Sequence, residues 1–155
     1  MPNKQKIVAV NPARMGSSRF PGKPLKKILG IPMIEHVRRR VEMSKILDEV
    51  LVATCDEEIY GTVNSFNGNA IMTSNVHERA SDRVAEVATK IDADIFVLVQ
   101  GDEPMMRPDM NDSVEAPLLD DTSIPGMILA MHITVESIWR NPDTVKIIHL
   151  SLIHI

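Results

Sequence analysis

The sequence has one cysteine, few aromatic residues and no long apolar run. The single thiol, Cys55, excludes an internal disulfide and a multi-cysteine metal site, and a buried or inert thiol in a reducing compartment is the simplest interpretation. Aromatic residues make up only 3% of the chain, which leaves little stacking surface for single-stranded nucleic acid. No segment approaches the roughly 20 apolar residues that a membrane span needs. We therefore expect a cytoplasmic, soluble protein that binds neither nucleic acid nor membrane.

Acidic residues are missing from the first part of the chain. Residues 1–34 contain seven cations and no carboxylate, although the whole chain of 155 residues has a formal net charge of −4. The remaining residues hold 10 cations and 21 acids. A positive segment on an acidic body predicts a small anionic ligand, because a general polyanion surface would need a wider basic field.

The apolar residues, 44% of the chain, follow patterns that alternate between buried strands and amphipathic helices. This alternation predicts one α/β domain, a three-layer sandwich with a mostly parallel central sheet. Residues 94–100 are apolar on both faces and are predicted to lie in the middle of that sheet. The strands are predicted at 6–11, 49–54, 70–73, 94–100 and 127–134, and the helices from Pro32 onward and at 56–66, 77–91 and 108–119.

The helix that begins at Pro32 has a clear apolar face. Ile34, Val37 and Val41 share that face and are predicted to be buried. The charged residues of the same helix are predicted to lie elsewhere on its surface, at Glu35, Arg38, Arg39 and Glu42.

The segment "NPARMGSSRFPGKP", residues 11–24, directly follows the first predicted strand. Ligands of open α/β sheets bind beyond the carboxyl ends of the strands, so this loop is correctly placed for binding. Glycines let backbone amides approach a ligand, serines add donors, and cations make charge-assisted contacts with phosphate oxygens. These groups are Gly16, Gly22, Ser17, Ser18, Arg14, Arg19 and Lys23.

The spacing of this loop excludes a P-loop. Five residues separate Gly16 from Gly22, and Pro24 follows Lys23 where the P-loop needs a hydroxyl for Mg²⁺. A solvated basic loop without chemical purpose remains the alternative interpretation.

A second polar motif, "VQGDEP" at residues 99–104, follows the most apolar predicted strand. Asp102 and Glu103 would then lie in the same crevice as the basic loop, where a carboxylate can hold Mg²⁺ while the metal bridges phosphate oxygens. A polar turn is the alternative. "HERAS", which begins at His77, is not a zinc-protease motif, because Ser81 replaces the second histidine.

Four stretches of the chain together resemble the bacterial 3-deoxy-manno-octulosonate cytidylyltransferases, or CMP-KDO synthetases, within the nucleotide-sugar nucleotidyltransferases. The stretches are "PARMGSSRFPGKPL", "IPMIEHV", "VATCDEE" and "VQGDEP". The resemblance runs from about residue 7 to about residue 147. It implies a Rossmann-like nucleotide-diphospho-sugar transferase fold that is incomplete at the C-terminus, with a nucleotide-binding domain at 1–147 and a non-native or truncated tail at 148–155.

The resemblance also implies a reaction. CMP would pass from CTP to 3-deoxy-manno-octulosonate or a related acidic sugar with Mg²⁺ as cofactor and release of pyrophosphate, as a step in lipopolysaccharide precursor activation. The family forms homodimers, whose surface would be largely missing from this chain. Arg14, Lys23 and Asp102 would be catalytic, Asp102 would bind the metal and Gln100 would bind the sugar. The nucleotide would contact Ala13, Arg14, Gly16, Ser17, Ser18, Arg19, Lys23, Ala80 and Arg83.

One stretch departs from the family pattern. The nucleobase-recognition region usually reads HxSGT followed by an acid and arginine, whereas this chain has "HERASDR", with Arg79 and Ala80 in place of Ser and Gly. The departure leaves open a related enzyme acting on another sugar, and an inactive nucleotide-binding fragment. Arg83 is retained, with a helix-surface salt bridge as its alternative role.

Overall fold

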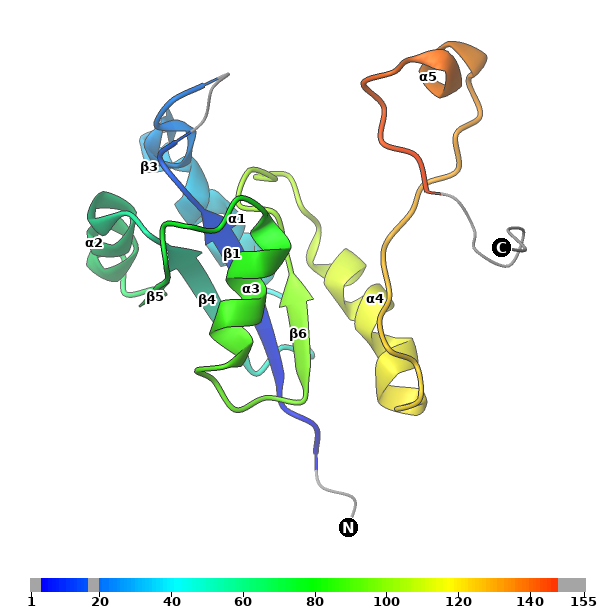
Figure 1. Ribbon diagram of the computed structural model, residues 1–155, viewed down its shortest axis with the longest axis horizontal. Coiled ribbons are helices and arrows are strands. Elements are labelled where there is room, and N and C mark those ends of the chain that lie inside the picture. Colours follow the sequence, from blue (N-terminus) through cyan, green and yellow to red (C-terminus); the bar gives the residue numbers. More distant parts are fainter. Residues whose placement is uncertain (1–3, 17–19, 148–155) are drawn as a thin grey trace.

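Four parallel strands form the central sheet of the computed structural model, which describes residues 4–16 and 20–147 (Figure 1). Their order is β5 (Asn69–Met72), β4 (Glu49–Thr54), β1 (Ile7–Ala13) and β6 (Ile95–Leu98). Val10 of β1 is paired with Leu51 of β4 on one side and with Leu98 of β6 on the other. The predicted α/β fold with a parallel sheet is confirmed.

Five α-helices and a short hairpin complete the described chain. The hairpin follows a 3-10 turn, η1 (Lys23–Leu25), and pairs β2 (Lys27–Ile28) with β3 (Ile31–Pro32). The helices are α1 (Met33–Val41), α2 (Glu57–Ser65), α3 (Ala80–Ala88), α4 (Pro108–Asp120) and α5 (Glu136–Arg140). None of the helices in the described ranges is long and apolar enough to cross a membrane.

Alternate residues of the central strands face opposite layers of helices. Val8 and Val10 pack with Val84 and Val87 of α3 on one face of the sheet. On the other face, Ala9 packs with α1, and the next cluster joins α1 to α2 through Ile34, Val52, Ile59 and Val63. Because strand side chains alternate between faces, this arrangement gives the three predicted layers.

The position of β6 differs from the prediction. Residues 94–100 were expected in the middle of the sheet, but in the described chain β6 lies at its edge and β1 is central. The side chains of β6 are only partly buried, and Leu98 is 36% exposed. An apolar run on both faces therefore does not distinguish a central strand from an edge strand.

The strand predicted at 127–134 is wrong. These residues have no regular secondary structure, and no sheet neighbour is assigned to them in the described chain. Met131 is 90% exposed. The helix predicted at 77–91 is shorter than expected, since α3 spans Ala80–Ala88.

The charged residues of α1 are also more buried than predicted. Glu35 is fully buried and Arg38 is 4% exposed. The Glu35 carboxylate accepts hydrogen bonds from Arg38 Nε at 2.7 Å and from Arg39 Nε at 2.5 Å. Burial opposes ionisation of Glu35, but these guanidinium groups outweigh it and hold its pKa below the ordinary value.

Candidate functional site

A cleft of about 670 Å³ opens beyond the carboxyl ends of β1 and β6. This is the expected position for a ligand in an open parallel sheet. The loop after β1, the turn η1, the residues around the start of α3 and the loop after β6 form the walls of the cleft. Its lining residues are Pro12, Ala13, Arg14, Gly16, Phe20, Lys23, Pro24, Met33, His77, Glu78, Arg79, Ala80, Arg83, Gln100, Gly101 and Asp102.

The predicted cation and the predicted carboxylate meet in this cleft. Lys23 Nζ lies 2.7 Å from Asp102 Oδ2, and both side chains are partly exposed. Gly22, with φ 69°, adopts the left-handed conformation just before η1, and its N–H donates to the carbonyl oxygen of Met15 at 3.0 Å. Only glycine adopts this conformation without strain, so Gly22 allows the chain to turn just before Lys23, whose ammonium group contacts Asp102.

Gly101, between Gln100 and Asp102, lies directly against the end of β1. A Cβ atom on Gly101 would lie 2.5 Å from the carbonyl oxygen of Pro12, a distance that real Cβ atoms do not reach. The absence of a side chain therefore lets the loop after β6 lie directly against the end of β1. Gln100 and Asp102, on either side of Gly101, both line the cleft.

The lining of the cleft carries more positive than negative charge. Arg14, Lys23, Arg79 and Arg83 contribute cations, whereas Glu78 and Asp102 contribute the carboxylates among the described lining residues. Arg14 and Arg79 are exposed. A concave, cationic surface of this size suits an anionic ligand with several phosphate groups.

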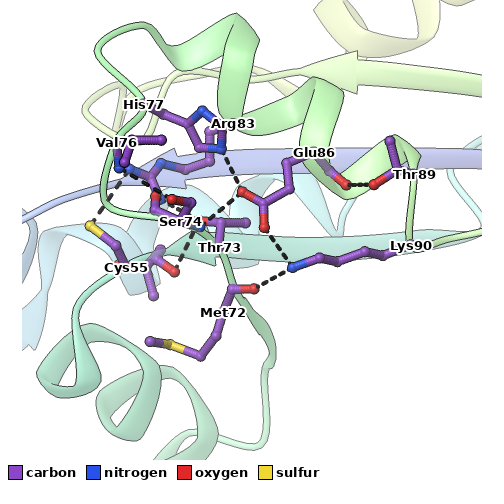
Figure 2. Close-up of polar contacts among 11 residues, drawn as sticks. Cys55, Met72, Thr73, Ser74, Val76, His77, Arg83, Glu86, Thr89 and Lys90 are labelled. Atoms are coloured by element: carbon purple, nitrogen blue, oxygen red, sulfur yellow. Dashed lines mark hydrogen bonds and ion pairs between the residues drawn. The ribbon is translucent and has the colours of Figure 1, made fainter.

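Arg83 is buried beneath the cleft wall rather than lying on the helix surface. Its side chain is 3% exposed, and it donates to Ser74 O at 3.2 Å, to the hydroxyl of Thr73 and, at 3.6 Å, to the thiol sulfur of Cys55 (Figure 2). The surface salt bridge considered for Arg83 is therefore wrong. Cys55 is partly buried and contacts this network.

Eight of the residues predicted to form the site line one cleft. They are Ala13, Arg14, Gly16, Lys23, Ala80, Arg83, Gln100 and Asp102. Ser17, Ser18 and Arg19 lie outside the described residues. The sequence reasoning missed Phe20, Met33, His77 and Glu78, although Phe20 sits inside the quoted loop and His77 and Glu78 begin the quoted "HERASDR" stretch.

Of the two carboxylates among the described lining residues, Asp102 is the one predicted to bind a divalent metal. Among residues 4–16 and 20–147 there is no group of three or more His, Cys, Asp or Glu side chains that could hold a metal ion. Mg²⁺ is usually held by one or two carboxylates together with substrate phosphates, so Asp102 in a cationic cleft fits a metal that arrives with its ligand.

Comparison with known proteins identifies the family. Residues 8–145 match the model of the cytidylyltransferase family. This chain belongs to that family. Two 3-deoxy-manno-octulosonate cytidylyltransferases, from Geotalea uraniireducens and Geobacter metallireducens, are 46% and 47% identical to this chain over 143 residues. The matched region is 92% of this chain in both cases.

A solved structure shares the fold as well as the sequence. The structure of CMP:2-keto-3-deoxy-manno-octonic acid synthetase complexed with CTP is 48% identical and superposes with a TM-score of 0.76 over 77% of this chain. That match covers 50% of the solved chain. The chain spans 57% and 56% of the length of these two relatives.

Proposed function

We propose that this chain forms the CTP-binding part of an enzyme that transfers CMP from CTP to 3-deoxy-manno-octulosonate and releases pyrophosphate, a step of lipopolysaccharide precursor activation. The observation that carries the proposal is the convergence of Arg14, Lys23 and Asp102 in one cleft. The names of the two relatives and the CTP complex of the similar structure support the choice of nucleotide and sugar.

The loop after β1 is proposed to bind the triphosphate. Arg14 and Lys23 would contact phosphate oxygens, and backbone amides near Ala13 and Gly16 would add donors. Ser17, Ser18 and Arg19 are proposed for the same role, because they lie between Gly16 and Lys23 in the sequence. Fixed cations at this position would stabilise the negative charge that develops on the departing pyrophosphate.

The other cleft residues are proposed to bind the nucleoside and the sugar. Ala80 and Arg83 belong to the α3 wall and are assigned to the nucleotide, whereas Gln100, next to Asp102, is assigned to the sugar. A hydroxyl oxygen of the sugar would attack the α-phosphorus and give up its proton to water, while the bond from that phosphorus to the pyrophosphate oxygen breaks.

The Asp102 carboxylate is proposed to hold Mg²⁺. The metal, when bound, would draw negative charge from the phosphate oxygens and help to acidify the attacking hydroxyl. The homodimer implied by the resemblance and the cytoplasmic location expected from the composition stay predictions.

Calorimetry with the 155-residue chain tests which nucleotide the cleft binds. We expect CTP with Mg²⁺ to bind at least about tenfold more tightly than ATP, GTP or UTP, and Lys23→Met and Asp102→Asn each to weaken binding by about tenfold or more. Lys27→Met is the matched control, because Lys27 is an exposed cation on β2 that does not line the cleft. Equal losses in all three variants would contradict a specific cleft.

A second candidate is a related nucleotidyltransferase that uses another nucleotide or sugar. The exposure of Arg79 in the cleft favours it, because Arg79 stands where the family pattern has Ser. Release of pyrophosphate from each nucleotide with 3-deoxy-manno-octulosonate, sialic acid and a neutral sugar phosphate separates the two. CTP binding without pyrophosphate release under any of these conditions would identify the noncatalytic nucleotide-binding fragment.

A further inference from the structure

The carboxylate of Glu86 on α3 contacts three groups just outside the cleft, two of them from the segment that precedes the helix. Its Oε2 atom accepts from the backbone N–H of Ser74 at 2.8 Å and lies 2.5 Å from His77 Nε2, while Oε1 accepts from Lys90 Nζ at 2.6 Å (Figure 2). An ionised carboxylate can only accept, so His77 Nε2 carries the proton in this contact.

These contacts keep Glu86 ionised. The Lys90 ammonium, the Ser74 amide and the His77 imidazole together lower the pKa of Glu86 to about 2. The carboxylate therefore keeps its charge, and its capacity to accept all three hydrogen bonds, across the neutral range.

The segment that Glu86 contacts forms a wall of the cleft. Residues 73–79 connect β5 to α3 without regular secondary structure, and His77, Glu78 and Arg79 from this segment line the cleft. The Thr73 N–H donates to the carbonyl oxygen of Thr54 at 2.8 Å, but beyond this bond the segment has no ladder of backbone hydrogen bonds in the described chain, so side-chain contacts hold the rest of it. Glu86 itself is not among the lining residues.

Two neighbours of Glu86, Arg83 on α3 and Lys90 just after the helix, contact the start of this segment and the end of β5. Arg83 donates to the carbonyl oxygen of Ser74 at 3.2 Å, and Lys90 donates to that of Met72 at 3.0 Å. Figure 2 shows Arg83 and Glu86 of α3, and Lys90 just after the helix, extending toward Met72, Ser74 and His77. Of these three side chains, Glu86 alone contacts both the Ser74 backbone and His77, which lines the cleft.

We propose that Glu86 is a positioning residue for nucleotide binding, which fixes the 73–79 wall through the Ser74 amide and the His77 imidazole without touching the ligand. The proposal rests on the proposed function, because it assumes that the cleft binds CTP. Arg14 and Lys23 approach from other segments, so this wall faces the part of the nucleotide beyond the phosphates.

Binding of two ligands to the 155-residue chain tests the proposal. In Glu86→Ala we expect the Kd for CTP with Mg²⁺ to rise about tenfold, because the wall loses its charge-assisted anchors, while the Kd for inorganic tripolyphosphate changes less than about twofold. Glu86→Gln keeps one acceptor oxygen but loses the charge, so a rise of about threefold is expected; this variant serves if Glu86→Ala does not fold. Glu58→Ala, an exposed glutamate of α2, should change neither Kd.

Three outcomes would overturn the proposal: an unchanged CTP Kd in both Glu86 variants, an equal loss for CTP and tripolyphosphate, and a loss of the same size in Glu58→Ala. If the unmodified chain does not bind CTP, the proposed function fails instead. Hydrogen exchange then decides the positioning role without a ligand, since amides of residues 73–79 should exchange faster in Glu86→Ala than in the unmodified chain, with α2 unchanged. Unchanged exchange at 73–79 would refute it.

Discussion

Residues 4–120 and residues 121–147 use similar apolar residues and reach different structures. The first region contains all the core clusters of the described chain, whereas no described residue of 121–147 is buried. In Figure 1 the later segment stands away from the sheet and carries only the short helix α5. The contrast shows that apolar composition alone does not produce a folded element.

Two stretches make the comparison specific. Residues 49–54 form β4, which has β1 on one side and β5 on the other and helices over its faces. Residues 127–134 are equally apolar but have no strand beside them in the described chain. A strand needs a neighbouring strand to hydrogen-bond its backbone groups and a layer of helices to cover its apolar side chains. Of the two stretches, 49–54 has both and 127–134 does not.

The largest expected difference between the regions comes from truncating one apolar side chain in each. Ile34 is fully buried and Met131 is 90% exposed. We expect Ile34→Ala to lower the free energy of unfolding by about 3–4 kcal/mol, because it leaves a cavity, and Met131→Ala to change it by less than about 0.5 kcal/mol. Urea unfolding followed by circular dichroism measures both. Comparable losses would mean that 121–147 packs as tightly as the sheet.

The next effect depends on pH and concerns α4, at the end of the packed region. Glu115 is fully buried, neither carboxylate oxygen has a hydrogen-bond partner, and burial together with the charge of Asp112 raises its pKa to about 7. The folded state thus holds this proton more tightly than the unfolded chain, whose ordinary value is 4.5. Stability should therefore fall as pH rises from 4.5 through about 7, by about 3 kcal/mol.

Glu115→Gln removes this contribution while keeping the size of the side chain. Unfolding measured at about pH 5 and about pH 8 should show a decline with pH that is smaller by about 2–3 kcal/mol in the variant. Parallel declines in the two proteins would show that Glu115 does not titrate in this interval.

A smaller effect is expected from a methyl group added to a glycine in each region. A Cβ atom on Gly68 would lie 2.5 Å from Arg38 Nε and 2.7 Å from Arg38 Cδ, whereas Gly126 has no atom within 4 Å of the same position. Arg38 is itself held by Glu35, so it cannot move aside freely. We expect Gly68→Ala to destabilise the fold by about 1–3 kcal/mol and Gly126→Ala to have little effect, by the same unfolding measurement.

The smallest effect is spectroscopic. Trp139, the single tryptophan of the chain, lies on α5 and is 57% exposed. Its emission should be that of an indole in water and should shift little through the unfolding transition seen by circular dichroism, because unfolding exposes it little further. A large red shift at that transition would place Trp139 in a packed environment.

Much of the fold was predictable, because the spacing of apolar residues and the positions of glycine and proline reflect local structure well. The strand at 49–54 was predicted with its observed bounds, and the basic loop was correctly placed at the carboxyl end of the first strand, although that strand continues to Ala13 instead of ending at residue 11. Pro32, followed by Ile34, Val37 and Val41, marked α1 in the same way. These features depend on neighbours in the sequence.

The errors concern contacts between distant residues. The edge position of β6 depends on which strands pair, which apolar content does not encode. Arg38 was expected at the surface, yet its stem crosses Gly68 and its guanidinium meets Glu35, a burial that periodicity alone does not predict. The Glu86 contacts were missed for a similar reason, since they join α3 to a loop that has no repeating pattern.

The ion pair between Lys23 and Asp102 bears on which form of the proposed nucleotide would fit the cleft. An anion that arrives alone draws the ammonium away and leaves a carboxylate facing other negative charge. When the same anion arrives with a divalent cation, each partner of the broken pair finds a new opposite charge. Magnesium-complexed triphosphates should thus be favoured over free ones by the charge balance of the cleft itself.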